Sequence, residues 1–148
     1  MRVSHRDAPS SHLLLDTHAL VWSVENAPRL GSVAKKMINE AARKDRIVVS
    51  AISPWEVALL VSKKRLSLDG DVMDWMRSAL ARPGVRLAPL EPEIAVASAR
   101  LPFAMHGDPA DRILVATARR LGATLVTADE ALLGLAKGGH VRVMDARV

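Results

Sequence analysis

Short runs of strand-forming residues alternate along this chain with longer segments of helical periodicity, and this alternation constrains the fold more than any other feature. The clearest runs are Leu13–Leu15, Ile47–Val49 and Thr124–Thr127, with further candidates at Val85–Leu87 and Val141–Val143. A short, continuous apolar run is typical of a strand that is buried on both faces. We therefore expect an α/β protein whose central parallel sheet is covered by helices on both faces.

The 148 residues are enough for one domain, and neither a repeat nor a linker divides them. We expect a polar tail over residues 1–12 and one folded domain over residues 13–148. The apolar runs are far shorter than the roughly 20 residues that a membrane span needs. Residues 1–12 also lack the apolar core of a signal peptide, so the sequence predicts a cytoplasmic protein without a membrane segment.

A helix is expected from Ser32, as its capping residue, to about Lys44. Its buried face is predicted to carry Val33, Met37 and Ala41, which are spaced by four residues.

Two acidic residues directly follow predicted strands. Asp16 comes after the run 13–15, and a helix is expected from about Ala19 to Glu25. Asp129 comes just after the run 124–127. In open α/β sheets, ligands bind beyond the carboxyl ends of the strands, which is where both acids are predicted to lie. Each also has a simpler explanation, since Asp16 can accept backbone hydrogen bonds in a turn and Asp129 can cap a helix.

Two more acidic residues occupy the third position of helices that are predicted to begin with proline. Glu56 ends the motif Ser53-Pro54-Trp55-Glu56, and Asp111 ends Asp108-Pro109-Ala110-Asp111. Both motifs have the form of a capping box, with an acceptor, a proline, a spacer and an acid. Capping alone would explain Glu56 and Asp111 taken singly.

Taken together, the four acids predict a metal site. Carboxylates that converge repel one another, and all-oxygen ligation suits Mg²⁺ or Mn²⁺. The chain has no cysteine, which excludes thiolate sites, disulfides and cysteine nucleophiles. Setting these four aside leaves 12 of the 16 acidic residues against 21 Lys and Arg, a balance that favours a nucleic-acid partner but also serves solubility. A carboxylate-bound cation under a basic surface suits phosphodiester hydrolysis.

Four stretches resemble the PIN domain family, and specifically the VapC-type toxins of type II toxin–antitoxin systems. They are Leu14–Trp22, Ser50–Ala58, His106–Ala118 and Thr124–Asp129, which together span nearly the whole chain from Leu13 on. The resemblance implies a three-layer α/β/α domain with an acidic pocket. It also implies a Mg²⁺- or Mn²⁺-dependent ribonuclease that acts on RNA, a cognate antitoxin that blocks the pocket, and a homodimer.

Carried over residue by residue, the resemblance makes Asp16, Glu56 and Asp111 the metal ligands and Asp129 the fourth, more variable acid. Thr127 stands where a hydroxyl often supports the ligands.

Several neighbouring residues stay open between a structural and a functional role. Asp108 could reach the same pocket, but as a helix cap it would use its oxygens on backbone N–H groups. Arg112 is as well explained by a structural contact as by a phosphate contact. His18 follows the Asp16 strand end, where a lone histidine is expected to pack or to form hydrogen bonds rather than to bind a metal. His106 shows no zinc-ligand spacing.

Two rival functions are distinguishable from the nuclease. A phosphatase of the haloacid-dehalogenase type would use Asp16 as a nucleophile, but it needs a second Asp where this chain has His18. The other rival is an inert PIN-like module that binds protein or RNA, and metal binding would separate it from the enzyme.

Overall fold

The computed structural model describes residues 12–148, so residues 1–11 of the predicted tail lie outside the described part of the chain. In chain order the elements are β1 (Leu13–Leu15), α2 (Thr17–Glu25), α3 (Ser32–Arg43), β2 (Ile47–Ser50), α4 (Ile52–Ser62), α5 (Val72–Leu80), β3 (Val85–Ala88), α6 (Pro92–Ala99), α7 (Pro109–Leu121), β4 (Thr124–Thr127), α8 (Glu130–Leu133), the 3₁₀ helix η1 (Gly134–Gly138) and β5 (Arg142–Asp145). Along residues 12–148, no helix combines the length and apolar composition that crossing a membrane would require.

The five strands form one parallel sheet in the order β3-β2-β1-β4-β5. Strand β1 lies in the centre, where Leu14 is paired with Val48 of β2 and Leu125 of β4. Every residue of β1 and β2 is buried, as expected of strands covered on both faces. The predicted α/β class with a parallel sheet is confirmed.

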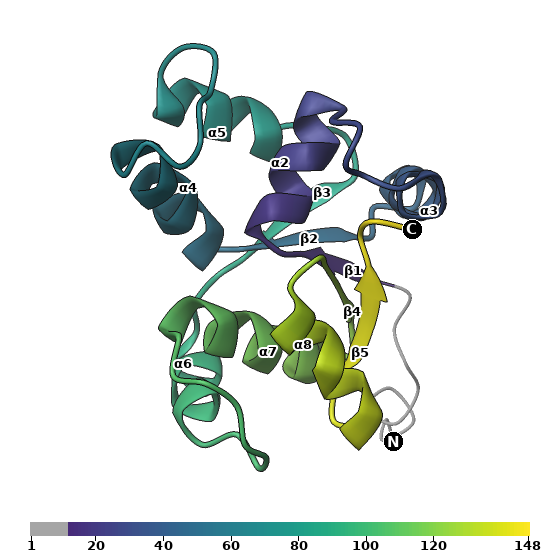
Figure 1. Ribbon diagram of the computed structural model, residues 1–148, viewed down its shortest axis with the longest axis vertical. Coiled ribbons are helices and arrows are strands. Elements are labelled where there is room, and N and C mark those ends of the chain that lie inside the picture. Colours follow the sequence, from purple (N-terminus) through teal and green to yellow (C-terminus); the bar gives the residue numbers. More distant parts are fainter. Residues whose placement is uncertain (1–11) are drawn as a thin grey trace.

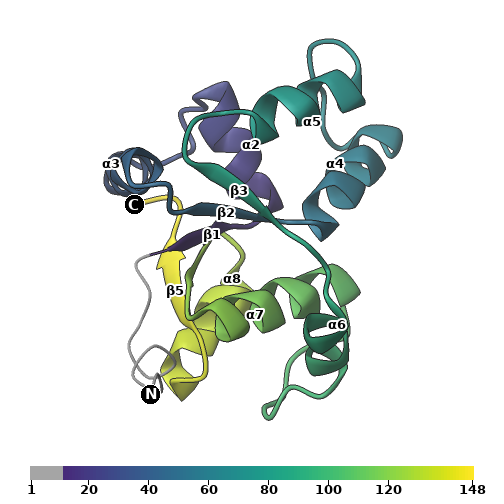
Figure 2. The same ribbon diagram turned by 180° about the vertical axis from the view of Figure 1, so that it is seen from behind.

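Helices cover both faces of this sheet (Figure 1, and from behind in Figure 2). Leu13 and Leu15 of β1 face one core, which they share with α2, α3, α4 and α5. Leu14 points the other way, into a second core shared with α7 and α8, and α6 packs against α7. The alternation of side chains along the strand thus produces the three-layer α/β/α arrangement.

The chain changes direction across the sheet between β1 and β4. From β1 it passes to β2 and β3 on one side, and it then returns to β4 and β5 on the other. Such a switch point opens a crevice at the carboxyl ends of the strands, where ligands bind in α/β folds. Asp16 follows β1 and Thr127 ends β4 at this point.

The predicted cap of α3 is wrong. Gly31, not Ser32, is the N-cap, and no side chain caps the helix. The end of the chain supplies the acceptors instead: the Gly31 N–H donates to the Ala146 carbonyl at 2.8 Å, and the Ala34 N–H donates to the Val148 carbonyl at 2.9 Å. A Cβ at Gly31 would lie 2.1 Å from the Val148 backbone, so this close approach requires glycine.

The predicted buried face of α3 is also largely wrong. Ala34, Ile38 and Ala41 are buried, whereas Val33 is 51% and Met37 is 42% exposed. Both stripes have helical spacing, so periodicity alone does not separate them. The stripe with two alanines is the one that packs against the sheet.

Candidate functional site

Asp16 lies between β1 and α2 and is only 6% exposed, and both of its carboxylate oxygens are hydrogen-bonded. Oδ1 accepts a hydrogen bond from the Ala19 N–H at 2.8 Å, and Oδ2 accepts one from the Thr127 hydroxyl. Asp16 therefore caps α2, which begins two residues earlier than predicted. Burial raises the pKa of Asp16, while these hydrogen bonds act to lower it.

Thr127 links Asp16 to Asp129. Its buried hydroxyl donates to Asp16, and the same oxygen accepts the Asp129 N–H at 3.0 Å. Asp129 itself is exposed, and its Oδ1 accepts the Leu132 N–H at 3.1 Å, so it caps α8 as the simpler explanation predicted. One hydroxyl thus sets the spacing of the two acids that follow β1 and β4.

The capping box predicted at Ser53 is wrong. Helix α4 begins at Ile52 with Ala51 as its N-cap, and the Ala51 side chain makes no capping hydrogen bond. The hydroxyl of Ser50, at the end of β2, accepts the Ile52 N–H at 3.1 Å, so the strand leads into the helix before the proline. Ser53 is therefore a buried residue inside the helix rather than its cap.

Glu56 is consequently not engaged at the helix end, and its carboxylate accepts a hydrogen bond from the Thr17 hydroxyl on α2. The Ser53 hydroxyl oxygen lies 3.4 Å from that of Thr17. Burial raises the pKa of Glu56, and the charges of Asp108 and Asp16 also raise it, whereas the Thr17 hydrogen bond lowers it. Sequence reasoning assigned no role to Thr17 and only a capping role to Ser53; the signal for Thr17 was a hydroxyl directly after the strand-end acid.

Asp111 lies in the first turn of α7, which begins at Pro109. Asp108 is the N-cap, as predicted, and its Oδ1 accepts the Asp111 N–H at 3.1 Å. Asp108 thus uses one carboxylate oxygen on the helix end and remains exposed.

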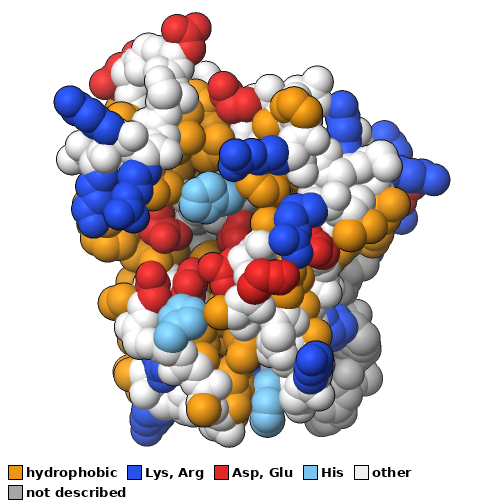
Figure 3. Space-filling model, viewed as in Figure 1, with side chains coloured by type: hydrophobic (Ala, Val, Ile, Leu, Met, Phe, Trp, Pro, Cys, Tyr) orange, Lys and Arg blue, Asp and Glu red, His pale blue; other side chains and the backbone are white. Residues whose placement is uncertain are grey.

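The four predicted acids converge at the carboxyl edge of the sheet. Burial, followed by the charges of Asp108, Asp129, Glu56 and Asp16, raises the pKa of Asp111 to about 7. Figure 3 shows acidic side chains gathered near the centre of one face, with histidine close by and Lys and Arg on both sides. Carboxylates that are far apart along the chain are therefore electrostatic neighbours.

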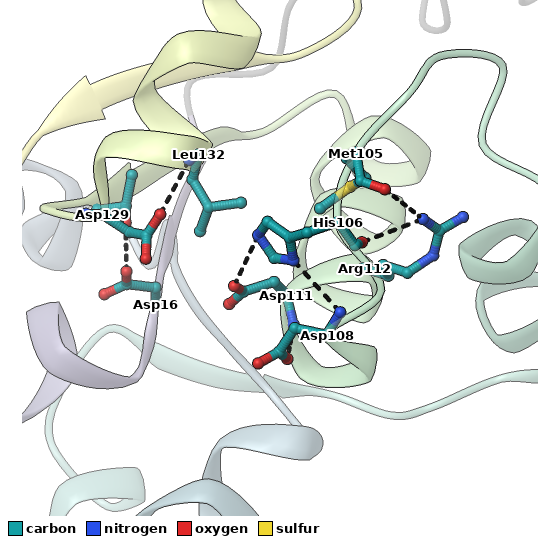
Figure 4. Close-up of polar contacts among 9 residues, drawn as sticks. Asp16, Met105, His106, Asp108, Asp111, Arg112, Asp129 and Leu132 are labelled. Atoms are coloured by element: carbon teal, nitrogen blue, oxygen red, sulfur yellow. Dashed lines mark hydrogen bonds and ion pairs between the residues drawn. The ribbon is translucent and has the colours of Figure 1, made fainter.

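His106 is a contact of Asp111 that the sequence analysis did not predict. Its Nε2 lies 3.4 Å from Asp111 Oδ2, and its Nδ1 accepts the Asp108 N–H at 3.3 Å (Figure 4). The sequence signal was weak, because a lone histidine in a loop before a helix shows no spacing typical of ligands.

Arg112 points away from the acids, toward the loop that precedes α7 (Figure 4). Its guanidinium donates to the carbonyls of Ser98 at 2.9 Å, Met105 at 3.3 Å and His106 at 3.3 Å. These contacts favour the structural explanation of Arg112 over a phosphate contact.

The carboxylate oxygens of these acids suit a hard divalent cation. The side chains are not, however, already positioned as a set of metal ligands. Within residues 12–148, no three His, Asp or Glu side chains are grouped closely enough to hold an ion as they stand. The carboxylates of Asp16, Glu56 and Asp111 instead contact Thr127, Thr17 and His106. All the acids offer oxygen, and burial and mutual repulsion raise the pKa values of Asp16, Glu56 and Asp111, so a cation would relieve an unfavourable arrangement.

The sequence matches the model of a known protein family. Residues 13–138 match the model of the PIN domain. The chain belongs to the PIN domain family. Ribonuclease VapC22 of Mycobacterium tuberculosis is 36% identical to this PIN domain over 120 residues, which cover 81% of this chain and 88% of the relative. The family resemblance read from the sequence is confirmed.

Solved structures show the same fold. VapBC2 from Rickettsia felis, bound to a DNA fragment from their promoter, has a TM-score of 0.63 and 16% identity, and the match covers 90% of this chain and 97% of that one. FitAcB from Neisseria gonorrhoeae has a TM-score of 0.61 and 23% identity, covering 89% and 96%. The predicted three-layer fold is confirmed by these neighbours.

Proposed function

We propose that this PIN domain is a cytoplasmic, divalent-metal-dependent endoribonuclease and the toxin of a type II toxin–antitoxin pair. The observation that carries the proposal is the convergence of Asp16, Glu56, Asp111 and Asp129 at the switch point of the sheet, where burial and mutual charge raise the pKa of the first three. The relative named Ribonuclease VapC22 supports ribonuclease activity as the reaction.

Asp16, Glu56 and Asp111 would hold Mg²⁺ or Mn²⁺, and Asp129 would support that ion or a second one. When bound, the ion polarises the phosphoryl oxygen and lowers the pKa of a water. Thr127 and the Ala19 N–H orient the Asp16 carboxylate from inside the fold. The matching support for Glu56 is the Thr17 hydroxyl.

The RNA backbone would be held by cations beside the acids. Lys63, Lys64 and Arg65 are exposed directly after α4, the helix that carries Glu56. Figure 3 shows Lys and Arg side chains flanking the acidic centre on both sides. Phosphate contacts of this kind make binding fall with rising salt.

The test is RNA cleavage with Mg²⁺ or Mn²⁺, with and without EDTA. We expect 5′-phosphate and 3′-hydroxyl products, no cleavage in EDTA, and at least a roughly 100-fold loss in Asp16→Asn. Asp69→Asn is the matched control, because this exposed carboxylate lies in the connection between α4 and α5. Cleavage that persists unchanged in EDTA or in Asp16→Asn would overturn the proposal.

The proposed partners are an antitoxin and a second copy of this chain. Solved neighbours named VapBC and FitAB, among them a DNA-bound VapBC from Salmonella typhimurium, support the antitoxin. Large apolar side chains lie exposed, as an interface requires: Val33, Met37, Trp55, Met73, Leu87, Leu90, Val96, Leu121 and Val148. Light scattering checks for the dimer. Co-expression with a small protein encoded beside this one, scored by rescue of growth, checks for the antitoxin.

A further inference from the structure

We propose that His106 is a positioning residue for the metal centre: it holds one oxygen of Asp111, and Arg112 braces the loop that carries it. The inference rests on the proposed function, because it takes Asp111 as a metal ligand. His106 does not itself touch the ion or the RNA in this proposal.

The two contacts of His106 define its tautomer. A neutral imidazole has one N–H donor and one acceptor nitrogen. Since Nδ1 accepts the Asp108 N–H, Nε2 carries the hydrogen and faces Asp111 Oδ2 at 3.4 Å. Asp111 Oδ1 accepts no hydrogen bond within the described part of the chain. One oxygen is therefore held by the imidazole, and the other is left for an ion.

Arg112 fixes the position of the imidazole from behind. It is the residue after Asp111 on α7, and its guanidinium donates to the carbonyls of Ser98, Met105 and His106 itself. A planar guanidinium offers several donors in a rigid fork, which one lysine amine cannot reproduce. The contacts form a closed path from α7 through the loop to His106 and back to α7 at Asp111 (Figure 4).

The loop does not need His106 in order to fold. Its side chain is 38% exposed and does not belong to the buried core. The loop is anchored by Leu101, Phe103 and Met105, which pack against the core between the sheet and α7. Substitutions at residue 106 should therefore leave the fold intact and report on the carboxylate.

Two substitutions separate the Asp111 contact from the loop contact. In His106→Gln the amide nitrogen stands near the place of Nε2 and can keep the contact with Asp111. In His106→Asn the shorter side chain stands near the place of Nδ1, so it can reach the Asp108 N–H but not Asp111. A role confined to the loop predicts that Asn is the better substitute, whereas the positioning role predicts Gln.

The measurement is calorimetric titration of the whole chain with Mn²⁺, beside its thermal unfolding. We expect His106→Asn to lose about 10- to 100-fold in Mn²⁺ affinity, and His106→Gln to stay within about 3-fold of the parent, as for residues that orient metal ligands. Equal affinities, or the reverse order, would overturn the inference and leave the nuclease in place. A parent chain that binds no Mn²⁺ would instead remove the proposed function, and this inference with it.

Arg112→Lys tests whether the hydrogen bonds of Arg112 position His106. We expect it to weaken Mn²⁺ binding by about 3- to 10-fold alone and to add nothing in the His106→Asn background, because both changes release the same carboxylate. Losses that multiply in the double variant would show that Arg112 does not act through His106.

Discussion

The two sides of the acidic site are built differently. Asp16 and Asp129 follow buried parallel strands and are joined through Thr127, which is 0% exposed. Asp111 is held from a loop, through the partly exposed His106. We expect the first side to stabilise the fold more than the second. Substitutions on the two sides should therefore separate effects on stability from effects on metal binding.

The largest effect on stability is expected at Thr127. Thr127→Val keeps the shape but leaves the buried Asp16 Oδ2 without its donor and the Asp129 N–H without its acceptor. Leaving such groups unpaired should lower the free energy of unfolding by about 3 kcal/mol, measured by urea denaturation at pH 7. Thr127→Ser keeps the hydroxyl and is the matched control. Equal losses in both would show that packing of the methyl group, not the hydrogen bonds, stabilises this side.

The pH dependence of stability should come largely from Asp111. Its pKa is about 7 in the folded chain against 3.8 as the ordinary value, so the folded state holds the proton more tightly. Stability is therefore lost as pH rises from about 4 to about 7, by at most about 4 kcal/mol and, after allowance for solvent, by about 2 kcal/mol. Burial of Asp16 and Glu56 acts in the same direction.

Asp111→Asn removes this titration. In EDTA, the free energy of unfolding of the variant should therefore rise relative to that of the parent as the pH increases from 5 to 8. Urea denaturation at both pH values measures the gain. A difference between variant and parent that is the same at both pH values would contradict the pKa of Asp111.

The smallest effect on stability is expected at His106. His106→Ala should change the free energy of unfolding by less than about 0.5 kcal/mol, because the side chain is partly exposed and the loop is anchored elsewhere. Urea denaturation beside Thr127→Val measures the contrast directly. A loss as large as that at Thr127 would mean that the loop side also stabilises the fold.

The sheet and one side of the site could be predicted from sequence, because both follow from local pattern. Runs such as Leu13–Leu15 and Thr124–Thr127 match β1 and β4 residue for residue. Parallel strands place their carboxyl ends together, so Asp16 and Asp129 follow from the strands alone.

The features that the sequence predicted wrongly, or did not predict, depend on contacts between segments that are distant in the sequence. The start of α4 depends on Ser50 at the end of β2, and the start of α3 depends on the carbonyls of Ala146 and Val148. His106 meets Asp111 from a loop whose carbonyls accept hydrogen bonds from Arg112, and no local periodicity encodes that contact. The acids themselves were found because their residue type is informative wherever it stands.

The close approach of the Val148 backbone to Gly31 has a practical consequence for truncation of this protein. A deletion of residues 146–148 would remove acceptors from the start of α3, more than a hundred positions earlier in the sequence. The damage would register as melting of an internal helix rather than as fraying of a tail.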